Sequence, residues 1–140
     1  MFGYDVVANT KDPMDRHGHG THCAGTITAV ADNGIGIVGV APKARIMAVK
    51  GLGDTGNATD RSLANSVVWS ADHGADVISA SWGGAGYSQL VKDAFDYAKS
   101  LGVVCIVAAG NDNSDARNYF PASFDNVVTV GYSGLEKSDQ

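Results

Sequence analysis

Apolar residues recur at every third or fourth position in two stretches of the chain, which is the spacing of one buried helix face. The first stretch follows Thr59, a favourable N-cap, and closes at Gly74, while the second closes at Gly102. The apolar positions are Leu63, Ala64, Val67, Val68 and Ala71 in the first stretch and Leu90, Val91, Ala94, Phe95, Ala98 and Leu101 in the second. The pattern predicts two amphipathic helices.

Four short stretches rich in valine and isoleucine are bounded by glycine or polar residues, as buried strands are. They cover residues 45–49, 76–82, 103–109 and 126–131. Strands that alternate with helices of this length indicate βαβ units, and hence an α/β fold with a parallel β-sheet sandwiched by helices.

The part of the chain before these elements has a different pattern. Residues 1–16 are polar and irregular, without a periodic apolar face, and we expect a loop there. Residues 19 to about 31 are small and β-branched and run into a polar turn, which predicts a further helix.

Composition limits the classes of protein to consider. A length of 140 residues with 44% hydrophobic and 18% charged residues predicts a single globular domain over residues 1–140. The net charge of −5 argues against a nucleic-acid partner, and no apolar run approaches the roughly 20 residues of a membrane span. Residues 1–5 do not resemble a signal peptide, so the compartment stays open. Cys23 and Cys105 are expected to be buried free thiols.

The strongest chemical signal is the histidine-rich segment at residues 17–25, where the expected helix begins. An imidazole in the first turn of a helix feels the positive end of the helix dipole, which favours the neutral form that a general base needs. His19 lies in the first turn of the expected helix and is therefore the candidate general base. A metal site built from His17, His19 and His22 is an alternative, although no glutamate follows as in a helical zinc-protease motif.

Unusual segments also follow two of the expected strands, at residues 81–84 and 109–112. Catalytic groups of parallel sheets gather at the carboxyl ends of strands.

Two other motifs are typical of different protein classes. Residues 54–56 copy the aspartate motif of pepsin-like proteases, which would need a second copy and an all-β pattern. Residues 34–39 fit a dinucleotide-binding pattern, which would need a preceding strand and a following helix.

The segment at residues 19–25 resembles the histidine motif of the subtilases, the subtilisin-like serine proteases of peptidase family S8. Three further segments resemble motifs of this family in the family's order, at residues 39–50, 81–84 and 108–111. The opening residues and Cys23 resemble the thermitase and proteinase K branches. The resemblance covers nearly the whole chain and implies the subtilisin-like three-layer fold and a serine-type endopeptidase.

The resemblance also implies roles for individual residues. His19 would be the general base and acid, and the side-chain amide of Asn111 would donate to the oxyanion. An extended polypeptide substrate would bind between two walls as an added strand. These walls are formed by Leu52 and Gly53 on one side and by Ser81, Trp82 and Gly83 on the other.

The family implies no cofactor for catalysis. The stretch around Asn33 resembles a loop that holds a structural calcium ion in many relatives, so Asn33 is a candidate calcium ligand. The resemblance further implies secretion, and it admits a propeptide as a partner.

Two family motifs have no counterpart in this sequence: the triad aspartate before the histidine and the nucleophilic serine after the oxyanion asparagine. We therefore expect the chain to be the central part of a catalytic domain, truncated at both ends and inactive alone. The alternative is a non-catalytic, subtilase-like module that binds peptides. Extending the coding sequence in both directions separates these two hypotheses.

Overall fold

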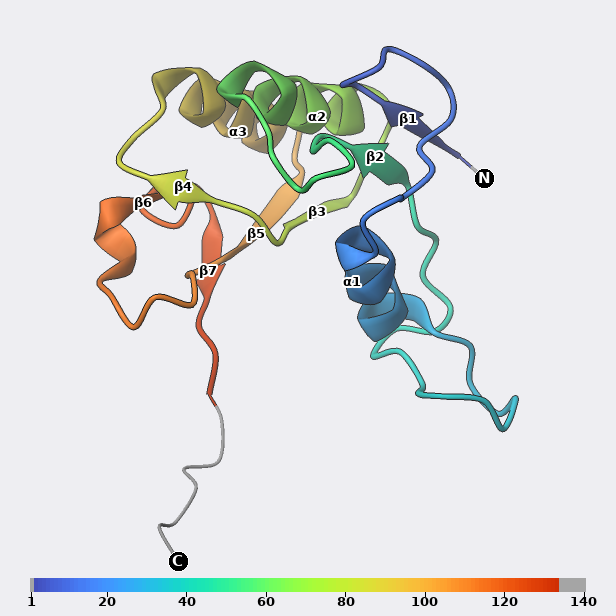
Figure 1. Ribbon diagram of the computed structural model, residues 1–140. Coiled ribbons are helices and arrows are strands. Elements are labelled where there is room, and N and C mark those ends of the chain that lie inside the picture. The colour runs from blue at the N-terminus through green and yellow to red at the C-terminus, as the bar shows by residue number, and fades with distance from the viewer. Residues whose placement is uncertain (1, 134–140) are drawn as a thin grey trace, which may run out of the picture.

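The computed structural model describes residues 2–133 and alternates helices with short strands along most of the chain (Figure 1). The helices are α1 (His19–Thr28), α2 (Asp60–Asp72) and α3 (Gln89–Ser100), with a short 3₁₀ turn, η1, at Ala116–Asn118. The strands are β1 (Gly3–Asp5), β2 (Ala48–Lys50), β3 (Val77–Ala80), β4 (Gly84–Ala85), β5 (Val104–Ala108), β6 (Tyr119–Phe120) and β7 (Val128–Val130).

The predicted parallel sheet is present in two pieces. One has the order β3-β5-β7, and its register places Ala80 beside Val107 and Ala108 beside Val130. The other is the parallel pair β1-β2, and the short strands β4 and β6 pair antiparallel. Among the described strands, none pairs with the free edge of β2 or with the free edge of β3.

The opening segment is not the loop that the sequence predicted, because it contains β1. Gly3 explains how this strand pairs so closely with β2: a Cβ atom there would lie 2.1 Å from the carbonyl oxygen of Ala48. The chain then folds back, and Asp5 N–H donates to the carbonyl of Thr10 at 2.9 Å. A strand of three residues is too short to show a periodic pattern in the sequence.

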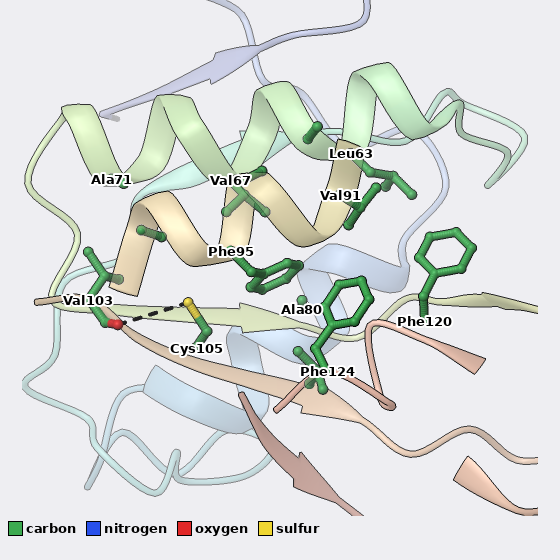
Figure 2. Close-up of a cluster of buried hydrophobic side chains, with 14 residues drawn as sticks. Leu63, Val67, Ala71, Ala80, Val91, Phe95, Val103, Cys105, Phe120 and Phe124 are labelled. Carbon is green, nitrogen blue, oxygen red and sulfur yellow. Dashed lines mark hydrogen bonds between the residues drawn. The ribbon is translucent and has the colours of Figure 1, made fainter. Parts of the chain in front are cut away.

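The core lies between the strands and the two predicted amphipathic helices, α2 and α3 (Figure 2). Val91 and Phe95 of α3 are fully buried. The ring of Phe95 contacts those of Trp82 and Phe124, with centroids 5.9 Å apart in both cases. Thr59 caps α2 as predicted, within a capping box.

The other face of the sheet is less covered. Four valines of the sheet are each about half exposed: Val77 at 54%, Val104 at 49%, Val128 at 53% and Val130 at 52%. Helix α1 lies on the opposite side of the strands from α2 and α3 (Figures 1 and 2), yet it buries none of its described residues. It also ends at Thr28, earlier than predicted, because the backbone of the following residue is extended, with ψ 139°.

Candidate active site

His19 is the first residue of α1, and its side chain crosses to the end of β3. Its Nε2 lies 2.9 Å from the carbonyl oxygen of Ser81, 62 positions away in the sequence. The structure thus brings together two of the predicted site residues, the candidate base and one wall of the candidate cleft.

The direction of this hydrogen bond defines whether Nε2 carries a proton. A carbonyl oxygen only accepts, so Nε2 of His19 carries a proton in this contact. To take a proton from a nucleophile through Nε2, the neutral imidazole must carry its proton on Nδ1 instead. A carboxylate that accepts from Nδ1 stabilises that second tautomer.

Asn111 follows the strand next to β3. Because Ala80 and Val107 are register partners, the residues after these strands leave the sheet at one edge. Ser81 directly follows β3, and Asn111 is the third residue after β5. Its side chain is exposed, and among the hydrogen bonds of the described residues none joins it to His19. The structure places Asn111 at the predicted edge without completing an oxyanion site.

The two predicted walls of the cleft are tied to the core. The side chains of Leu52 and Trp82 both pack against the buried cluster. Gly53 opens a tight turn, in which its N–H donates to the carbonyl of Asn57 at 2.8 Å. A Cβ atom at Gly83 would lie 2.8 Å from the carbonyl oxygen of Phe120, so this part of the second wall requires a glycine.

Two neighbours of His19 were not predicted to be part of the protease site, although His17 was considered as a metal ligand. Cys23 Sγ lies 3.9 Å from His19 Nε2, since residues four apart share a helix face. The ring of His17 stands edge-on to that of His19, with centroids 6.4 Å apart. His17 also lies against the first wall, because a Cβ atom at Gly56 would approach its Nε2 to 3.0 Å. The four-residue spacing of His19 and Cys23 was visible in the sequence and could have predicted their contact.

Asp54, which opens the pepsin-like motif at residues 54–56, has a structural partner. Its carboxylate accepts a hydrogen bond from the Lys50 ammonium, which also lies 3.8 Å from Asp5. The bond to Asp54, followed by the nearby negative charges, raises the pKa of Lys50. This ion pair joins β2 to the first wall of the cleft.

The metal hypotheses gain no support. Within residues 2–133 there is no group of three or more His, Cys, Asp or Glu side chains that could hold a metal ion. Asn33 lies in an exposed loop, where its Oδ1 accepts a hydrogen bond from the N–H of Ile35 at 3.0 Å. Calcium binding at Asn33 stays a prediction. In the part of the chain that the structure describes, no helix is long and apolar enough to cross a membrane.

Comparison with known proteins identifies the family. The family model described as the subtilase family, peptidase S8, matches residues 3–138. Thermitase from Thermoactinomyces vulgaris is 44% identical over 91% of this chain and 46% of its own length. Minor extracellular protease Epr from Bacillus subtilis (strain 168) is 39% identical over 91% of this chain and 20% of its own length.

The fold agrees with this assignment. A solved structure described as a cold adapted subtilisin-like serine proteinase superposes with a TM-score of 0.82 at 38% identity. The match covers 92% of this chain and 45% of that protein, which confirms the subtilisin-like α/β fold. The chain spans at most about half the length of each of these relatives. The histidine segment, the parallel sheet and these matches agree, and the chain belongs to the subtilase family.

Proposed function

We propose that the whole protein is a serine-type endopeptidase in which this chain supplies the general base, His19, and an oxyanion donor, Asn111. The observation that supports this most is the 2.9 Å contact between His19 Nε2 and the main chain at Ser81. It puts the imidazole beside the wall on which the substrate backbone is expected to bind.

In this proposal the serine and the triad aspartate come from residues outside the present sequence. His19 takes the proton of the serine hydroxyl as the oxygen attacks the substrate carbonyl carbon, and later gives that proton to the leaving amine. Asn111 donates a hydrogen bond to the oxyanion of the tetrahedral intermediate. The peptide lies extended between the walls at residues 52–53 and 81–83, paired with the main chain as an added strand.

These steps use protein groups alone, so the proposed chemistry needs no cofactor. Calcium near Asn33 would serve only as a structural ion. By analogy with its subtilase relatives, one of which is named an extracellular protease, we place the whole protein outside the cell. The substrate is a polypeptide, and a propeptide would be a second polypeptide that occupies the same cleft.

The test compares the whole protein with its His19→Ala variant on a chromogenic peptide and with a fluorophosphonate probe, which labels activated serines. His19→Ala is expected to lower kcat by about 10⁶, the magnitude known for subtilisin. His73→Ala is the matched control, because His73 is the C-cap of α2, where its Nδ1 bonds to the carbonyl of Trp69 and its ring stacks on that of Trp69. Hydrolysis that survives His19→Ala would contradict the proposal.

The 140-residue chain alone is expected to hydrolyse no peptide bond by a serine mechanism. His19 then has neither a nucleophile to activate nor a carboxylate to set its tautomer. Covalent labelling of a serine in the isolated chain would show that the chain contains an unrecognised nucleophile. A whole protein that binds peptides but labels no serine would instead be the non-catalytic module.

A further inference from the structure

The turn that leads into α1 is organised around one carboxylate, that of Asp15. Its Oδ1 accepts hydrogen bonds from the backbone N–H groups of His17 and Gly18, at 2.9 and 2.8 Å. Its Oδ2 accepts from the backbone N–H and the hydroxyl of Thr21, at 2.8 and 2.7 Å. The carboxylate therefore holds the chain on both sides of His19.

Asp15 takes over the task of an ordinary N-cap side chain. The N-cap of α1 is Gly18, which has φ 98° and no side chain to offer. Thr21 is the third residue of the helix, and its N–H is one that an N-cap side chain normally satisfies. The hydrogen bond from Gly18, followed by those from Thr21, holds the pKa of Asp15 well below its ordinary value of 3.8. The side chain is therefore a carboxylate at neutral pH.

Within the described residues, few other backbone contacts hold the first turn of α1. Residues 19–22 are exposed, and the partly buried residues of the helix lie further along it, between Cys23 and Thr28. Gly18 stands in a left-handed conformation, and its own N–H and that of His17 both donate to Asp15. The ring of His19 then reaches Ser81 from a turn whose geometry depends on that carboxylate.

We propose that Asp15 is a positioning residue for the general base, holding the first turn of α1 so that the His19 ring meets the reacting atoms. This inference rests on the serine-endopeptidase function proposed above. Asp15 acts through His19 and its turn, and the substrate backbone is held elsewhere, at residues 52–53 and 81–83. Loss of the carboxylate therefore changes proton transfer more than it changes substrate binding.

The experiment measures kcat and KM of the whole protein with Asp15→Ala, Asp15→Asn and Asp12→Ala. Asp15→Ala is expected to lower kcat about 10- to 100-fold, as a misplaced catalytic group does, and to leave KM within about twofold. Asp15→Asn keeps one acceptor oxygen for His17 and Gly18, so its kcat is expected between those of wild type and Asp15→Ala. Asp12→Ala removes a carboxylate of the same turn that accepts only from Met14 N–H, and kcat is expected to stay unchanged.

Thermal unfolding shows whether each variant is folded, and fluorophosphonate labelling carried to completion counts the molecules with an active serine, so that poor folding is not mistaken for a low kcat. Asp15→Ala with wild-type kcat, or with a raised KM at unchanged kcat, would overturn the positioning role while leaving the protease assignment intact. A wild-type protein that neither hydrolyses peptides nor labels with the probe would overturn the proposed function and the role of Asp15 together.

Discussion

The imidazole of His19 directs its Nε2 proton at the carbonyl of Ser81, and this polarity must reverse before the ring can act as a base. The contact shows that the ring points toward the end of β3, but the proton on Nε2 is not the arrangement that the proposed mechanism needs. A triad carboxylate at Nδ1 would supply the reversal without moving the helix. The proposed general base is thus already directed toward the end of β3, with a proton on the nitrogen that the proposed mechanism needs free.

A second residue-scale prediction concerns Asn111. With Asn111→Ala in the whole protein, we expect kcat to fall by about 10²–10³, the range known for removing one such donor from subtilisin. KM should change little, because the donor acts on charge that develops only in the transition state. Steady-state hydrolysis of a chromogenic peptide gives both constants. An unchanged kcat would show that Asn111 is an ordinary turn residue after β5.

The carboxylate of Asp15 predicts a pH dependence of stability. Its pKa is lowered in the folded state, so its contribution is present above the unfolded pKa of about 3.9 and is lost as the pH falls toward the folded-state pKa. We expect the difference in melting temperature between wild type and Asp15→Ala to be constant above about pH 5 and to shrink below about pH 4. A difference in melting temperature that does not vary with pH would show that the hydrogen bonds of Asp15 stabilise the fold even when its side chain is uncharged.

At the scale of elements, α3 joins the core to the proposed substrate wall, because the buried ring of Phe95 contacts Trp82. Phe95→Ala is expected to lower the free energy of unfolding by about 3–5 kcal/mol, since it leaves a cavity in a fully buried position. The sequence pattern assigned Leu90 to the buried face of the same helix, but its side chain is 51% exposed, so Leu90→Ala should cost about 0.5 kcal/mol or less. Denaturant unfolding of both variants measures the difference. Equal losses would contradict this account of the core.

The elements that the sequence pattern predicts well are those that bury a periodic face and carry their own caps. Both α2 and α3 fall within their predicted stretches, because Thr59 and the glycines at residues 74 and 102 mark their ends. Strand β1 could not be predicted this way. Its existence depends on pairing with a segment more than 40 residues away and on the close approach that Gly3 permits.

The candidate site, too, was predicted from the sequence only in part. The family motifs pointed to His19 and to the wall at Ser81, and the structure brings these two together. The sequence did not reveal the role of Asp15, because a carboxylate three residues before the N-cap belongs to no ordinary capping pattern. The position of Asn111 relative to the base depends on loop geometry that neither periodicity nor motif spacing sets.

On the scale of the whole molecule, the chain has a well-packed part and a sparsely packed part. The buried cluster is drawn from α2, α3, the strands β3 and β5 and the segment that reaches Phe124. The proposed general base, His19, lies on α1, which has no fully buried residue among those described. One hydrogen bond from His19 to Ser81 connects the base to the end of the well-packed sheet.

The sparse packing of α1 has a consequence for the order of folding. Segments that bury apolar surface acquire protection as a cooperative unit, whereas a helix with few buried contacts becomes stable only when its remaining partners arrive. In pulse-labelling hydrogen exchange during refolding of the whole protein, we expect the amides of α3 to be protected before those of α1. Protection of α1 at the same time as α3, or earlier, would contradict this order. If α3 is protected first, the proposed peptidase activity would emerge only after α1 has also formed, so that a molecule with only its core folded could not digest its neighbours.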